Sequence, residues 1–110
     1  MSYFVDSNVV TLQEGAGTVS RAVLKEENGC VNGFKIGIGI YAETTYDPAK
    51  AHEDQEGFIV LSGKGWALVG DEEAPLEPGT VFVAPKHTLH TIKSASKEVP
   101  VKVCWFHAAV

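Results

Sequence analysis

The chain has 110 residues, enough for one domain with a single hydrophobic core, which we place over residues 1–110. Fourteen acidic and nine basic residues give a net charge of −5 without a basic cluster, which argues against nucleic acid as a partner. No apolar run approaches the roughly 18 residues of a membrane span, and the N-terminus lacks a secretory signal pattern. We therefore expect no membrane partner and a cytoplasmic location.

The first half of the chain alternates between apolar and polar residues with a period of two, which is typical of β-strands. We expect a weak strand over residues 8–12, a stronger one over 18–25 and the longest strand over 33–45. In the third strand Gly37 and Gly39 alternate with isoleucines, which indicates that another part of the chain approaches the backbone closely.

The second half predicts six further short strands, over residues 57–61, 66–69, 74–76, 80–84, 89–94 and 101–108. Residues 62–65, Ser-Gly-Lys-Gly, indicate a hairpin turn between the first two of them, because glycine supplies positive φ at a tight turn. In the last strand Lys102 should face solvent. The alternate residues should then face inward, namely Val101, Val103, Trp105 and His107.

So many short strands in so small a chain hide their edges by curling into a closed or double-sheet antiparallel barrel. We therefore predict an all-β fold with antiparallel jelly-roll topology. A Greek-key sandwich of the immunoglobulin type fits the strand number too, but the chain lacks paired cysteines around a central tryptophan. Cys30 and Cys104 are expected to be free thiols.

Three residues stand out as possible metal ligands: His52, Glu56 and His90. His52 and Glu56 flank a short polar segment that leads into a strand, and His90 lies in the strand predicted over residues 89–94. Two neutral imidazoles and one carboxylate are donors that divalent first-row metals accept in sites with open coordination positions. A solvated turn and a hydrogen-bonded strand histidine would explain the same residues without a metal.

From residue 33 to 105 the sequence resembles a small single-domain cupin, whose two motifs fall within residues 44–94. The first motif runs Gly, five residues, His-x-His, three or four residues, Glu, six residues, Gly. The second runs Gly, five residues, Pro-x-Gly, two residues, His, three residues, Asn. The positions that match are His52, Glu56, Gly63, Gly79, Pro85 and His90, and those that depart are Thr44, Lys50, His87 and Ser94.

The resemblance implies a jelly-roll barrel, or double-stranded β-helix, whose cavity binds a divalent metal through His52, Glu56 and His90. Fe, Mn, Ni and Zn all accept these donors, and a small organic ligand or substrate would complete the coordination. Lys50 stands where the family has its first metal-binding histidine, so the motif supplies three donors instead of four. His87 or His107 could supply a fourth.

The reaction is left open by the sequence. With a metal, the resemblance implies a dioxygenase-like or isomerase-like enzyme, in which a desolvated Lys50 would be the candidate catalytic base. An inward Lys50 ammonium would also repel a metal cation, whereas an outward one would be solvated. The alternative is a metal-free binding or sensing module, in which Lys50 and His90 hold a sugar or an organic anion. Tyr41 and Arg21 could also face the ligand.

A double sheet this small leaves an edge strand and an outer apolar face exposed, which predicts a homodimer. The expected edge strand is the N-terminal one, and the residues expected on the outer face are Val81, Val83, Cys104 and Phe106. The resemblance implies the same, because cupins commonly associate in this way.

Overall fold

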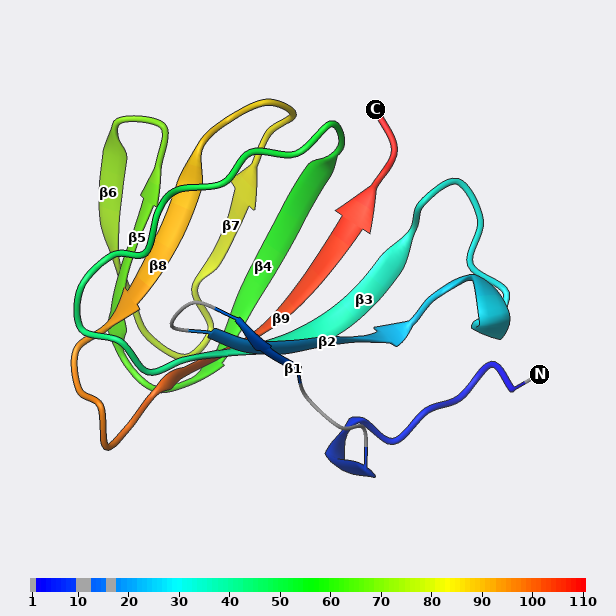
Figure 1. The fold of residues 1–110 in the computed structure, drawn as a ribbon, viewed down its shortest axis with the longest axis horizontal. Coiled ribbons are helices and arrows are strands. Elements are labelled where there is room, and N and C mark those ends of the chain that lie inside the picture. Colours follow the sequence, from blue (N-terminus) through cyan, green and yellow to red (C-terminus); the bar gives the residue numbers. More distant parts are fainter. Residues whose placement is uncertain (1, 10–12, 16–17) are drawn as a thin grey trace.

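The computed structural model describes residues 2–9, 13–15 and 18–110 (Figure 1). Within these ranges nine strands form two antiparallel sheets. The larger sheet has the order β1-β2-β3-β9-β4-β7, and the smaller has the order β6-β5-β8. In the described ranges the helical elements are two short 3-10 turns, η1 and η2. Neither is long or apolar enough to cross a membrane.

The strands are β1 (Gln13–Gly15), β2 (Thr18–Leu24), β3 (Lys35–Tyr41), β4 (Gln55–Ser62), β5 (Gly65–Val69), β6 (Glu72–Leu76), β7 (Val81–Ala84), β8 (His90–Ser94) and β9 (Val101–Ala108), and the 3-10 turns are η1 (Ser7–Val9) and η2 (Glu26–Asn28).

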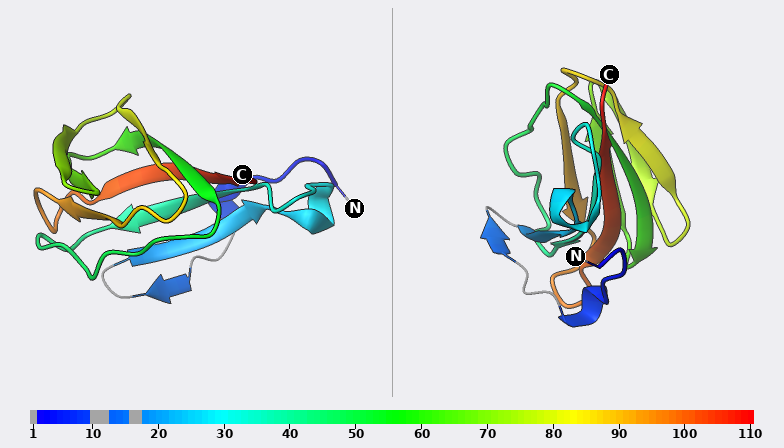
Figure 2. Two further views of the ribbon diagram at one scale, coloured as in Figure 1. Left: turned by 90° about the horizontal axis from the view of Figure 1, so that it is seen from above. Right: turned by 90° about the vertical axis from the view of Figure 1, so that its right-hand side faces the viewer.

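The strands curve around a common core and do not lie flat, as the view from above in Figure 2 shows. The core lies between the two sheets, and its fully or almost fully buried members are Phe58, Val60, Ala67, Leu76, Ala84, Ile92, Val101, Val103 and Trp105. These residues come from strands of both sheets, so each sheet covers the apolar face of the other. The prediction of an all-β antiparallel jelly-roll is confirmed.

Strands β4 and β9 alternate between buried and outward-facing residues as predicted, because successive side chains in a strand point to opposite faces. On β4 the buried residues are Glu56, Phe58 and Val60, and on β9 they are Val101, Val103, Trp105 and His107. The two strands are hydrogen-bonded neighbours, with Phe58 opposite Trp105. Their inner faces therefore form one continuous wall of the barrel.

The glycines of β3 allow the close approach that their spacing predicted. A Cβ atom at Gly37 would lie 2.1 Å from a ring carbon of Trp105 and 2.6 Å from the backbone oxygen of Arg21. The strand is shorter than predicted, because it ends at Tyr41 and the chain then crosses toward the smaller sheet, where the Glu43 carbonyl accepts the Ser94 N–H at 2.8 Å. β4 and β9 have eight residues each and β3 has seven, so β3 is not the longest strand.

The hairpin predicted at residues 62–65 is wrong. β4 belongs to the larger sheet and β5 to the smaller one, so this turn carries the chain between the sheets. Gly63 has φ +82°, and a Cβ there would lie 2.1 Å from the Pro100 oxygen. The glycine thus serves close packing against the loop before β9 as well as the turn itself.

The strand predicted over residues 8–12 is also wrong for residues 8 and 9, which the structure describes. Ser7–Val9 is a 3-10 turn, because the Asp6 carboxylate accepts the Asn8 N–H at 2.9 Å and the Asp6 carbonyl accepts the Val9 N–H at 3.2 Å. Local side-chain bonding of this kind competes with strand pairing. Residues 10–12 lie outside the described residues.

Candidate metal centre

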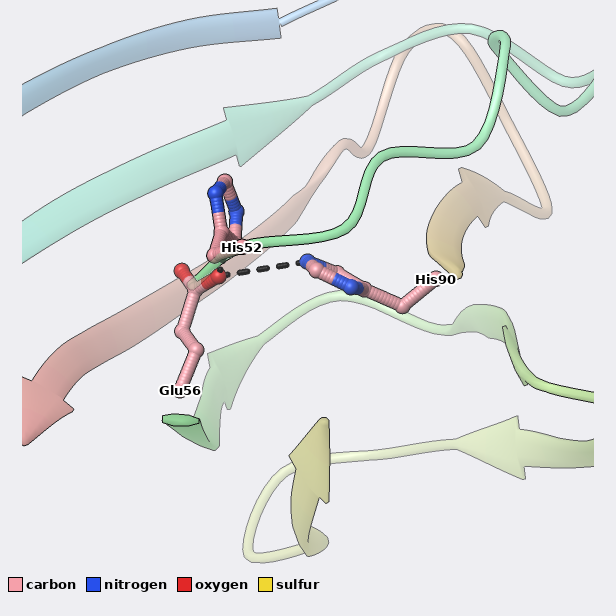
Figure 3. Close-up of side chains that lie close together, drawn as sticks. All are labelled: His52, Glu56 and His90. Carbon is pink, nitrogen blue, oxygen red and sulfur yellow. Dashed lines mark hydrogen bonds and ion pairs between the residues drawn. The ribbon is translucent and has the colours of Figure 1, made fainter. Parts of the chain in front are cut away.

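The three predicted donor residues come together where β4 and β8 begin (Figure 3). His52 lies in the turn before β4, Glu56 is on β4 and His90 begins β8. One donor atom from each lies within 4.8 Å of the other two. Glu56 Oε1 is 3.2 Å from Nε2 of His52 and 3.2 Å from Nε2 of His90. Two imidazoles therefore converge on one carboxylate oxygen.

Backbone hydrogen bonds hold the two motifs together at this point. The Lys50 N–H donates to the His90 carbonyl at 3.0 Å, and the His90 N–H donates back to the Lys50 carbonyl at 2.8 Å. The His87 N–H donates to the His52 carbonyl at 2.8 Å. His87 has φ +63°, a left-handed conformation that explains why the motif usually has glycine there.

The site is buried most deeply at its carboxylate. Glu56 is 7% exposed, and the side chains of His90 and His52 are 10% and 36% exposed. Burial lowers the pKa of His52, and the nearby His90 and His107 act in the same direction. Burial also acts to lower the pKa of His90, but the hydrogen bonds to Glu56 and to the Thr88 carbonyl outweigh it, so that the pKa is raised overall.

The donor cluster opens into a cavity of about 290 Å³. Its apolar walls come from Phe58, Ile92 and Trp105. Tyr41 lines it, as predicted. Burial raises the Tyr41 pKa above its usual range, and the Glu56 and Asp47 carboxylates raise it further, so the hydroxyl keeps its proton and can donate a hydrogen bond. Arg21 does not line it. Its neighbour Ser20 does, because alternate residues of β2 face opposite sides, and Ser20 Oγ accepts the Trp105 indole N–H at 3.0 Å.

Lys50 lies at the cavity with its side chain exposed to solvent. Its backbone is fixed by the pairing with His90, and its positive charge is close enough to His90 to act toward lowering the pKa of that imidazole. Its role as a catalytic base stays a prediction.

The two histidines considered as fourth donors have different surroundings. His107 is buried, and its Nε2 is 3.4 Å from Glu56 Oε2. His87 is an exposed turn residue, and its Nε2 is 3.2 Å from Glu53 Oε2. Sequence spacing predicted that His107 faces inward but not that it reaches Glu56. The signal that places it there is the pairing of β4 with β9, in which Glu56 lies opposite His107.

Comparison with known proteins agrees with this architecture. L-ectoine synthase from Vibrio parahaemolyticus is 26% identical over 95 residues, which are 82% of this chain and 69% of the relative. Among solved structures, the Cnp3 cupin domain of Schizosaccharomyces pombe superposes with a TM-score of 0.79 at 22% identity, covering 96% of this chain and 68% of the other. A predicted oxalate decarboxylase from Thermotoga maritima superposes with a TM-score of 0.83 at 15% identity, covering 97% and 99%.

The sequence pattern of the cupin domain matches residues 38–107, which run from β3 to β9 and include every donor described above. This chain belongs to the cupin domain family.

Proposed function

We propose that this cupin binds a divalent metal at the barrel end through Nε2 of His52, a carboxylate oxygen of Glu56 and Nε2 of His90. The observation that carries the proposal is the convergence of these three donor atoms to within 4.8 Å of one another. Two imidazoles and a carboxylate leave coordination positions open, and a metal in such a site acts as a Lewis acid toward an oxygen atom of the ligand. Fe, Mn, Ni and Zn all accept these donors.

The hydrogen bonding of His90 supports a cation at this point. Its Nδ1 is 3.0 Å from the Thr88 carbonyl oxygen, which can only accept, so Nδ1 carries the proton in the neutral ring. The lone pair of Nε2 then faces Glu56 Oε1 at 3.2 Å. A lone pair and a carboxylate repel each other at this distance unless a proton or a cation lies between them. The donor set therefore fits a metal.

The cavity suits a small organic ligand with oxygen atoms. Its volume of about 290 Å³ is at the lower end of the range for ligand pockets. Phe58 and Trp105 would contact the carbon skeleton, while the Tyr41 hydroxyl and the Lys50 ammonium would bind oxygen atoms or negative charge. With such a ligand and a metal, an enzyme of the dioxygenase or isomerase type remains the reading that the family resemblance favours.

Metal analysis tests the proposal directly. Protein purified without a histidine tag is dialysed and its metal content is measured by mass spectrometry. We expect a stoichiometric metal in the wild type and its loss in His52→Ala and His90→Ala. His87→Ala, which removes an exposed histidine outside the cavity, is the matched control and should keep the metal. Unchanged metal content in both cavity variants would rule the site out.

The position of Lys50 favours a second candidate, a metal-free module that binds a sugar or an organic anion. Lys50 lines the same cavity as His90 and offers a positive charge at its mouth. The variant Lys50→His separates the two candidates. Restoring the motif histidine should raise metal affinity markedly if the cavity is a metal site. If the cavity binds an anion, metal binding should stay negligible, and anion binding should be lost.

We also propose that the chain forms a homodimer through the outer face of β7, β4 and β9. Val81 and Val83 are 64% and 51% exposed, and Ile59, opposite Val81 in the sheet, is 36% exposed. Contiguous exposed apolar residues of this kind are typical of protein–protein contacts. Light scattering at micromolar concentration should give the mass of a dimer, and Val83→Glu should give a monomer. A monomeric wild type would refute the proposal.

A cytoplasmic location is proposed from the cysteines. Cys30 and Cys104 are both free, as proteins in reducing compartments keep them. Cell fractionation followed by immunodetection tests this, and recovery of the protein in an oxidising compartment would contradict it.

A further inference from the structure

A second histidine–carboxylate pair lies directly behind the proposed metal centre. His107 Nδ1 is 3.0 Å from each carboxylate oxygen of Asp54, and His107 Nε2 is 3.4 Å from Glu56 Oε2. His107 is 8% exposed, and the Trp105 ring packs against it edge-on, with centroids 5.4 Å apart and planes at 79°. The imidazole is thus held between two carboxylates.

This arrangement determines which nitrogen of His107 is free to bind a cation. An ionised carboxylate only accepts hydrogen bonds, so Nδ1 keeps its proton and donates a hydrogen bond to Asp54. In the neutral ring, Nε2 then holds a lone pair that faces Glu56. His90 repeats the pattern with the Thr88 carbonyl in the place of Asp54. In their neutral forms both rings therefore present an unprotonated nitrogen to the same carboxylate from different strands.

His52 lacks this support in the described part of the chain. Its side chain is 36% exposed, and within residues 2–9, 13–15 and 18–110 no protein group forms a hydrogen bond with its Nδ1. Histidines that bind metals almost always donate their other ring N–H to a carboxylate, a backbone carbonyl or water, which fixes the ring and the tautomer. By this criterion His107 is better prepared for a metal than the motif histidine His52.

We propose that His107 is the fourth protein ligand of the metal centre, with Asp54 holding it in the ligating tautomer. The inference rests on the proposed function of the same site. The first motif lacks one imidazole because Lys50 stands at that position. His107, on the last strand β9, supplies an imidazole in its place. His107 lies outside the set whose donor atoms are mutually within 4.8 Å, so binding must draw the side chains inward to metal–nitrogen distances of about 2.1 Å.

The first test measures Co²⁺ affinity by calorimetric titration of the full chain. We expect Asp54→Asn to weaken binding about 10- to 100-fold, which is the usual effect of losing the partner of a ligating histidine. His107→Ala should weaken binding at least as much. In the His107→Ala background, Asp54→Asn should cause no further loss, because Asp54 acts through His107. The exposed pair provides matched controls, and His87→Ala and Glu53→Gln should leave the affinity unchanged.

The second test counts imidazole ligands by pulsed electron paramagnetic resonance of the Cu²⁺-loaded protein. His107→Ala should show one coordinated imidazole fewer than the wild type. His107→Gln is measured as well, with circular dichroism of each variant, so that a folding defect in one variant does not decide the outcome.

The outcomes separate this inference from the proposed function. Wild-type affinity in both His107 variants would overturn the inference, and so would weakened binding with an unchanged imidazole count, since His107 would then merely position Glu56. In either case, loss of binding in His52→Ala and His90→Ala would leave the proposed function standing. A wild-type protein that binds neither Co²⁺ nor Cu²⁺ would contradict both this inference and the proposed function.

Discussion

The two ends of the barrel interior differ in chemistry, although the same two strands line both. At one end Val60 of β4 lies opposite Val103 of β9, and these side chains are 1% and 0% exposed. At the other end Glu56 lies opposite His107, beside a cavity. Phe58 and Trp105 form the layer between them. The packed end supplies the apolar burial that stabilises the fold, and it thereby fixes the position of charged groups that are costly to bury.

Stability and metal binding should therefore respond to different substitutions. A change at the apolar end should lower the free energy of unfolding without touching the donor atoms. A change at the polar end should remove metal binding and leave most of the packing in place.

Phe58→Ala should have the largest effect on stability. The ring is 1% exposed, stacks on Phe82 with centroids 4.5 Å apart and meets the His90 ring at 5.8 Å. Its loss should lower the free energy of unfolding by about 3–5 kcal/mol, measured by urea denaturation. Val31→Ala, which removes a side chain that is 73% exposed and lies outside the proposed dimer face, is the control and should cost much less. A comparable loss in both variants would contradict the burial of the Phe58 ring.

Metal addition should distinguish the two ends most clearly. At a free metal concentration 100 times Kd, the wild type should gain about 2.7 kcal/mol in the free energy of unfolding, because the metal binds the folded chain. Val60→Ala should be less stable than the wild type but keep this gain, whereas Glu56→Gln should lose it. Urea denaturation of all three proteins with and without metal makes the measurement. Loss of the gain in Val60→Ala would show that the ends are not independent.

Gly37→Ala should have a smaller but still measurable effect. The new Cβ would meet both the Trp105 ring and the Arg21 backbone, and overpacking of this kind costs about 1–3 kcal/mol. Gly39→Ala is the comparison, because its nearest neighbour would be a Tyr41 ring carbon at 3.2 Å. Thermal unfolding followed by tryptophan fluorescence should rank the two variants in this order. A greater loss in Gly39→Ala would contradict the close approach of Trp105.

Much of the fold could be predicted from the sequence because β4 and β9 each have one buried face. Alternation along such strands places Phe58, Val60 and Val103 inward without any knowledge of the partner strand. The turn at Gly63 shows where this reasoning ends. Its residues predict a turn correctly, but whether the strands on either side pair with each other depends on the whole sheet arrangement, and here they belong to different sheets.

The candidate site was predictable to a similar extent. His52, Glu56 and His90 follow from the spacing of two motifs that the fold brings together. Asp54 and His107 fall in no such pattern, because their contact depends on the register between β4 and β9, where Gln55 lies opposite Ala108. A shift of one residue in that register would have turned every side chain of the strand to the other face.

Position 50 is held in place by its main chain and not by its side chain. Its N–H and carbonyl both bond to His90, and any residue except proline can form these bonds. The side chain at the cavity mouth can therefore be exchanged while these backbone bonds are kept. The same tolerance makes residue 50 a practical starting point for engineering new ligand preferences into this barrel.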